Sequence, residues 1–153
     1  MDKTVAENRG IDERLFHKIS AKLRDTPACQ TMGISVKYLG QGTAGLKMTV
    51  SQEFKNSQGL LHGGFIAALA DTAMGYSIVT LGLRIVTLDL NINYFTPALM
   101  GTDLSAEANV LHVGKNTIVA EATLYNSDKK LVAKSRGTFF LSRSPETVKS
   151  SEF

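Results

Sequence analysis

The sequence predicts an α+β protein in which six strands accompany one long, apolar helix. The helix is expected from about Gly64 to about Val79, because apolar residues recur there at helical spacing. Six other segments alternate apolar and polar residues, which is the pattern of strands buried on one face. The connections between them are short, and short connections favour antiparallel pairing of consecutive strands.

Composition and charge are those of a single globular domain. The chain has 153 residues, of which 43% are hydrophobic and 20% charged. The net charge of +3 comes from scattered basic residues, which argues against a nucleic-acid partner and is compatible with an anionic small ligand. Cys29 is the only cysteine and the three histidines lack metal-ligand spacing, so we expect neither an intrachain disulfide nor a metal site.

The first ten residues lack the apolar core of a signal peptide and are too acidic for a typical transit peptide. The apolar stretch 60–83 is long enough for a membrane span, but His62, Asp71 and four glycines argue against one. We therefore expect a soluble, cytoplasmic protein. Its predicted organisation is a flexible segment over 1–10, one domain over 11–141 and a flexible, polar tail over 142–153.

The elements before the central helix are a short helix and a hairpin. An amphipathic helix is predicted over residues 12–25, with Asp12 as its N-cap and Pro27 ending it. We expect this helix to pack on the outside of the domain. Strands over residues 32–39 and 44–50 follow, and the glycine-containing turn between them predicts a hairpin.

Four further strands follow the central helix, over residues 84–96, 102–112, 116–125 and 130–141. In the first of these, alternation predicts an apolar face made of Val86, Leu88, Leu90, Ile92 and Tyr94. The opposite, polar face is expected to contain Thr87, Asp89, Asn91 and Asn93.

The central helix contains one carboxylate, Asp71, which is its least expected residue. Lone acids are rarely buried unless they are paired or used in chemistry. Apolar surroundings would raise the pKa of Asp71, which suits a catalytic base or nucleophile better than an acid on the helix surface. Gly63 and Gly64 lie at the helix start, where open backbone N–H groups could stabilise an oxyanion, although such glycines also simply begin helices.

Gly63 and Asp71 are too far apart to act on one carbonyl within one chain. Their eight-residue separation corresponds to roughly 12 Å along a helix, whereas a reacting group needs partners at about 3 Å. Two helices related by a two-fold axis can bring Gly63 of one chain to Asp71 of the other. If the two residues act together, the protein is an obligate homodimer with composite sites.

The motif Asn56…Gly59…His62-Gly63-Gly64…Ala70-Asp71, followed by Val86-Thr87-Leu88-Asp89-Leu90-Asn91-Ile92-Asn93-Tyr94, resembles the hotdog-fold acyl-CoA thioesterases of the PaaI-like group. The resemblance extends from about Met32 to Leu141. It implies a hotdog fold, in which a six-stranded antiparallel sheet wraps round the central helix. It also implies hydrolysis of an acyl-CoA to a carboxylic acid and free coenzyme A, which is part of the substrate, so no cofactor is expected.

The resemblance also assigns roles to the residues of the motif. Asp71 is expected to be the nucleophile or the general base, and the Gly63 N–H to polarise the thioester carbonyl. His62 would orient the loop, Asn56 would hold the thioester or the water, and Thr87 would position the water. From the residues alone, His62 is more often a helix N-cap or a core histidine than a catalyst. Asn56 could simply cap a turn, and Thr87 could be an ordinary strand residue.

Coenzyme A is expected, by the same resemblance, in a slot beside the strand edge and a nearby turn. The residues of this slot are Asp89, Tyr94, His112, Val113, Gly114, Lys115, Asn116 and Thr117. Lys115 is the first candidate for a phosphate contact, with Lys134 and Arg136 as possible additions. The family commonly pairs dimers, so a homotetramer is expected.

The acyl group is expected beside Met74, Tyr76 and Leu81, at the distal end of the helix. Two other functions remain open. A non-catalytic acyl-CoA-binding module would keep the slot without using Asp71. A hotdog hydratase acting on an enoyl thioester would need a His-and-acid pair in motifs that this sequence lacks.

Overall fold

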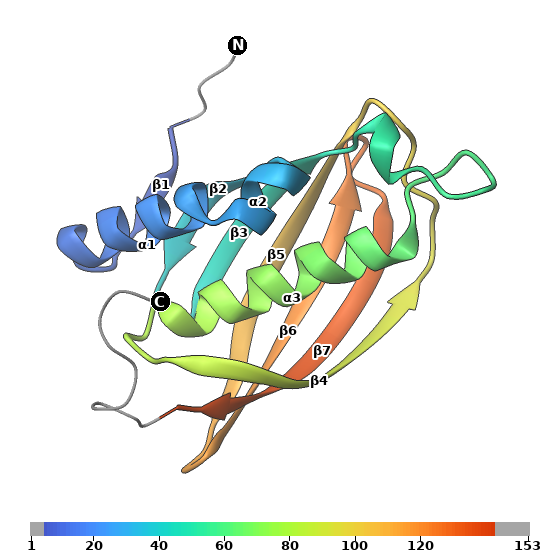
Figure 1. Ribbon diagram of the computed structural model, residues 1–153. Coiled ribbons are helices and arrows are strands. Elements are labelled where there is room, and N and C mark those ends of the chain that lie inside the picture. Colours follow the sequence, from blue (N-terminus) through green and yellow to red (C-terminus); the bar gives the residue numbers. More distant parts are fainter. Residues whose placement is uncertain (1–4, 143–153) are drawn as a thin grey trace.

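The computed structural model describes residues 5–142 and has the predicted α+β layout (Figure 1). In chain order its elements are β1 (Glu7–Arg9), α1 (Glu13–Asp25), α2 (Pro27–Met32), β2 (Ile34–Gly40), β3 (Thr43–Thr49), a short 3-10 helix (Gln52–Phe54), α3 (Gly63–Val79), β4 (Ile85–Tyr94), β5 (Asp103–Val113), β6 (Thr117–Asn126) and β7 (Leu131–Leu141). The predicted elements are therefore all present, with bounds shifted by one to two residues.

One curved sheet wraps round α3, with strand order β1-β2-β3-β5-β6-β7-β4 (Figure 1). The helix crosses the concave face, and the core is the apolar layer between the two. Its largest fully buried side chains include Leu46, Met48, Leu69, Met74, Leu104, Leu124 and Phe139. Helices α1 and α2 cover the β2–β3 side of this layer, whereas β4 forms the opposite edge of the sheet.

The sheet has seven strands within the described residues, one more than predicted, and the additional strand β1 pairs in parallel with β2. Residues 7–9 were assigned to the flexible N-terminal segment because three polar residues carry no strand pattern. Side-chain contacts hold them instead. Asn8 donates to the carbonyl of Ile11 at 3.0 Å and accepts from its N–H at 3.0 Å, and the Arg9 guanidinium lies 3.6 Å from the centre of the Tyr38 ring.

Helix α1 has the predicted cap, because Asp12 accepts a hydrogen bond from the N–H of Leu15 at 3.0 Å. Pro27 ends α1 as expected but also begins α2, which the sequence analysis missed. Proline suits the first position of a helix, where its missing N–H would have no partner. Gly33, with φ 64°, ends α2 in the left-handed conformation.

A β-bulge at Leu88 overturns the predicted faces of β4. Thr87 pairs with buried Phe139, whereas Asp89 pairs with Thr138, so the register shifts between them. The extra residue resets the alternation of side chains. Thr87 therefore faces α3, and the prediction that it shares the outer polar face with Asp89 was wrong.

The same bulge leaves two predicted inner residues on the surface. Val86 is 60% exposed and Leu88 57% exposed, and Val86 lies opposite Phe140, which is 45% exposed. These side chains form an uncovered apolar patch beside the sheet edge.

Of the predicted tail 142–153, residues 143–153 lie outside the described residues. Within residues 5–142, none of the helices combines the length and the hydrophobicity of a membrane-crossing segment.

Candidate active site

Helix α3 begins at Gly63 because His62 caps it. Nδ1 of His62 accepts a hydrogen bond from the N–H of Gly64 at 2.9 Å. An accepting Nδ1 puts the proton of the neutral ring on Nε2. The capping role that the sequence left open for His62 is thus confirmed.

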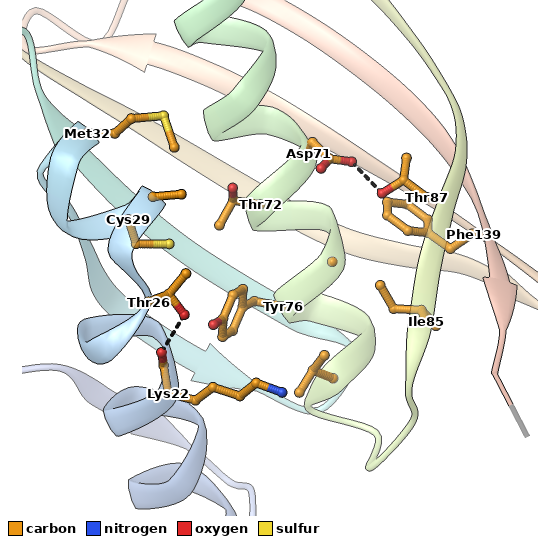
Figure 2. Close-up of a pocket in the computed structure, with 13 residues that line it drawn as sticks. Lys22, Thr26, Cys29, Met32, Asp71, Thr72, Tyr76, Ile85, Thr87 and Phe139 are labelled. Carbon is orange, nitrogen blue, oxygen red and sulfur yellow. Dashed lines mark hydrogen bonds between the residues drawn. The ribbon is translucent and has the colours of Figure 1, made fainter. Parts of the chain in front are cut away.

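Asp71 lies two turns into α3, half-buried, and its carboxylate is held from β4. The Thr87 hydroxyl donates to Oδ1 of Asp71 at 2.9 Å (Figure 2). Burial raises the pKa of Asp71 above its usual value, and the Thr87 hydrogen bond lowers it in part. The direction agrees with the prediction, and the second carboxylate oxygen accepts no hydrogen bond from residues 5–142.

Gly63 is held from the other end of β4. The hydroxyl of Tyr94 donates to the carbonyl oxygen of Gly63 at 2.8 Å. A Cβ at Gly63 would lie 3.2 Å from the Tyr94 ring, so glycine allows this close approach. Within residues 5–142, no acceptor is recorded for the N–H of Gly63 itself, and this group is available to a ligand.

Asn56 shapes the loop that leads into α3. Its side-chain oxygen accepts hydrogen bonds from the N–H groups of Gln58 at 2.9 Å and Leu60 at 3.0 Å. The turn-capping reading of Asn56 is therefore confirmed. Its amide nitrogen donates no recorded hydrogen bond to residues 5–142, so a contact with a ligand stays a prediction.

A pocket of about 280 Å³ opens beside Asp71, between α3, the α1–α2 pair and the start of β4 (Figure 2). The lining combines polar groups near Asp71 with apolar walls, and consists of Lys22, Thr26, Ala28, Cys29, Met32, Asp71, Thr72, Gly75, Tyr76, Val79, Ile85, Thr87 and Phe139. Tyr76 lies where the acyl group was expected, but Met74 is fully buried and Leu81 is not part of the wall.

The α1–α2 wall is the part of the pocket that sequence reasoning missed. The sequence placed Lys22 on an outer helix and Met32 at the start of a strand, and it assigned Cys29 to no element. The available signal was Pro27, which permits a second helix and so folds Cys29 and Met32 back toward α3.

The family relationship is decided by comparison with known proteins. The model of the thioesterase superfamily matches residues 58–133, which include Gly63, Asp71 and Thr87. The acyl-coenzyme A thioesterase PaaI of Escherichia coli strain K12 is 35% identical over 127 residues, which cover 83% of this chain and 91% of PaaI. The chain belongs to the PaaI-like thioesterases.

Two solved structures resemble this PaaI-like chain over most of its length. The structure of the E. coli PaaI protein superposes with a TM-score of 0.81 at 29% identity, covering 87% of this chain and 96% of that one. A hypothetical thioesterase protein from Streptococcus pneumoniae TIGR4, solved with coenzyme A, has a TM-score of 0.69 at 27% identity, covering 71% of this chain and 88% of that one. The hotdog fold predicted for this chain is thus confirmed.

The residues predicted to bind coenzyme A do not form one continuous surface in this PaaI-like chain. Asp89 and His112 lie in the same outward-facing row of the sheet, because His112 pairs with Val119, Val119 with Thr138, and Thr138 with Asp89. The turn between β5 and β6 lies near them. Tyr94, in contrast, points to Gly63. The coenzyme A slot stays a prediction.

No group of three or more His, Cys, Asp or Glu side chains within residues 5–142 is arranged to hold an ion.

Proposed function

We propose that this protein is an acyl-CoA thioesterase that hydrolyses a thioester to a carboxylic acid and free coenzyme A. The observation that carries the proposal is the Thr87–Asp71 hydrogen bond of 2.9 Å at the mouth of a pocket. Family membership supports it, since the E. coli relative is named as an acyl-CoA thioesterase. Solved variants of the S. pneumoniae thioesterase replace an Asp and a Thr separated as Asp71 and Thr87 are here.

Asp71 is the proposed reacting group, and the Thr87 bond leaves its second oxygen for chemistry. In one route this oxygen attacks the thioester carbon, the C–S bond breaks, coenzyme A leaves as a thiolate and water hydrolyses the acyl-aspartyl anhydride. In the other route Asp71 takes a proton from water, whose oxygen attacks the same carbon. The C–S bond then breaks, and the departing thiolate takes the proton from Asp71. Both routes end with the acid and protonated coenzyme A.

The proposed site is composite and needs a homodimer. Along α3, Gly63 and Asp71 are separated by roughly 12 Å, so one protomer does not supply both to one carbonyl. The exposed edge of β4 and the uncovered apolar side chains Val86, Leu88 and Phe140 provide a surface for a second copy. The N–H of Gly63 of the partner subunit would then polarise the carbonyl over Asp71, and pairing of dimers would give a homotetramer.

The substrate positions follow from the same arrangement. The acyl group is proposed in the pocket between α1–α2 and α3, whose walls include Cys29, Met32 and Tyr76. Coenzyme A is proposed along the outer row from Asp89 to His112 and the adjoining turn, with Lys115 near its phosphates. A cytoplasmic location remains part of the proposal and is tested by cell fractionation.

The experiment measures release of the free thiol from a panel of acyl-CoAs, together with the oligomeric state at each enzyme concentration. We expect hydrolysis whose specific activity falls in proportion to the dimer fraction on dilution. Asp128→Asn, in the exposed turn after β6, is the matched control and is expected to retain full activity. Binding of acyl-CoA without any hydrolysis would favour the non-catalytic module, and full activity in a monomer would overturn the composite site.

A further inference from the structure

Strand β4 contacts both halves of the proposed site, one at each end. Thr87 donates to the carboxylate of Asp71, and seven residues later Tyr94 donates to the carbonyl of Gly63. Building on the proposed function, we infer that Tyr94 is a positioning residue that sets the direction of the Gly63 N–H. This role differs from the coenzyme A contact expected for Tyr94 from the sequence.

The peptide group between Gly63 and Gly64 is held on both sides. Its carbonyl accepts from the Tyr94 hydroxyl at 2.8 Å, and its N–H donates to Nδ1 of His62 at 2.9 Å. Two hydrogen bonds on opposite sides fix the plane of a peptide that two adjacent glycines would otherwise leave free to rotate. The preceding N–H, that of Gly63, belongs to the His62–Gly63 peptide, whose carbonyl accepts from the N–H of Phe65 at 3.0 Å. The two held peptides share the Cα of Gly63, so Tyr94 acts on the Gly63 N–H through this junction, and that N–H is the group left for the substrate.

The Tyr94 side chain has the chemistry that this role needs. Burial raises the pKa of Tyr94, so the hydroxyl stays protonated and remains a donor at neutral pH. Its ring lies against Gly63, where an added Cβ would be 3.2 Å from Cζ. A donor 1 Å out of place loses much of its effect on a developing oxyanion, because that interaction depends on preorganised geometry.

The test compares Tyr94→Phe, which keeps the ring and removes the donor, with the control Tyr125→Phe on β6. We expect Tyr94→Phe to lower kcat about tenfold while KM and the melting temperature stay close to those of wild type. A merely structural role would lower the melting temperature and leave kcat per folded dimer unchanged, and that result would overturn the inference. A rise in KM with unchanged kcat would do so as well, because it would indicate a coenzyme A contact.

Mixed dimers separate this inference from the proposed function. If the sites are composite, pairing Asp71→Asn chains with Tyr94→Phe chains leaves one site with both residues intact, and activity returns to about half of wild type. If Tyr94 supports the site of its own chain, both sites stay impaired and activity remains near one twentieth. Absence of acyl-CoA hydrolysis by wild type would instead contradict the proposed function itself.

The pocket beside Asp71 has opposite charges at its two ends. Figure 2 shows Asp71 at one end and the Lys22 side chain extending from α1 across the other, with Tyr76 between them. No carboxylate of residues 5–142 forms a salt bridge with Lys22. From this independent observation, and on the proposed function, we propose that Lys22 selects acyl groups whose far end is anionic, as in monothioesters of dicarboxylic acids.

The charges of Asp71 and Lys22 favour one orientation of the acyl group in the pocket. An anionic end is repelled by Asp71 and attracted by Lys22, and the apolar wall from Cys29 to Met32 suits the methylene groups between. Lys22 is solvent-exposed before binding, so its contribution to selectivity is moderate, about threefold to tenfold.

The test measures kcat/KM for an ω-carboxyacyl-CoA and for the neutral acyl-CoA of equal length. We expect Lys22→Gln to lower the ratio of the two values about threefold to tenfold and Lys22→Glu to lower it further, whereas the control Lys18→Gln leaves it unchanged. An equal loss for both substrates, with weaker inhibition by free coenzyme A, would place Lys22 on the coenzyme A side and overturn the proposal. An unchanged ratio would overturn it too.

Discussion

The two halves of the proposed site are held by the same strand in different ways. At the middle of α3, Thr87 binds the reacting side chain of Asp71 directly. At the start of α3, the Tyr94 hydroxyl donates to the carbonyl of Gly63, and His62 accepts from the N–H of Gly64. The difference teaches that a reacting side chain can be fixed by one direct contact, whereas a backbone donor is fixed indirectly, through hydrogen bonds on the neighbouring peptide groups.

The largest expected effect is at the reacting side chain. Asp71→Asn keeps the size and an acceptor for Thr87 but removes the negative charge, so kcat is expected to fall at least about a hundredfold. Steady-state thiol release on one acyl-CoA checks this, with size-exclusion chromatography to confirm that the oligomer persists. Turnover within a few-fold of wild type would mean that the helix-start amides alone support the reaction.

Removal of the donor that holds Asp71 should have a smaller effect with a distinct pH signature. Thr87→Val is expected to lower kcat about tenfold. The Thr87 hydrogen bond lowers the Asp71 pKa, so its loss raises that pKa and shifts the acidic limb of kcat/KM to higher pH. Thr87→Ser, which keeps the hydroxyl, is the control. If the acidic limb of kcat/KM does not move in Thr87→Val, the group that titrates in this limb is not Asp71.

Loss of the helix cap should affect stability more than chemistry. His62→Ala removes the acceptor for the Gly64 N–H and is expected to lower the free energy of unfolding by about 1 kcal/mol. His62→Asn can replace the cap and should recover most of that loss. Chemical denaturation of the purified protein measures this free energy. A hundredfold loss of kcat in both variants would make His62 a participant in the reaction instead of a support.

The smallest expected effect is on thermal stability, which should rise in the same Asp71→Asn variant that loses activity. Because burial raises the folded-state pKa of Asp71, its stabilising contribution is complete below the unfolded-state pKa and is lost as pH rises through the folded-state value. Asp71→Asn stays neutral, so its melting temperature should exceed that of wild type by about 2 to 4 °C near pH 8. Melting curves over pH should show the gain shrinking toward the acidic range. A gain in melting temperature that does not change with pH would indicate a packing effect of the substitution and not the loss of the Asp71 charge.

Most of this fold could be predicted from the sequence because its periodicities are strong. The alternation of β4 predicted a strand but not the bulge at Leu88, since a bulge leaves no mark in a pattern of alternating residues. Asp71 stood out as an acid in an apolar helix. Nothing local linked Tyr94 to Gly63, because that contact joins residues 31 apart in the chain.

The edge of β4 also affects how a separated protomer would behave. One side of this ten-residue strand pairs with β7, and its other side presents a row of backbone groups to solvent, beside exposed Val86, Leu88 and Phe140. Such an edge pairs with any extended chain that it meets, so an isolated subunit would be prone to aggregate. Substitutions that weaken subunit association are therefore expected to reduce the soluble yield before they change turnover.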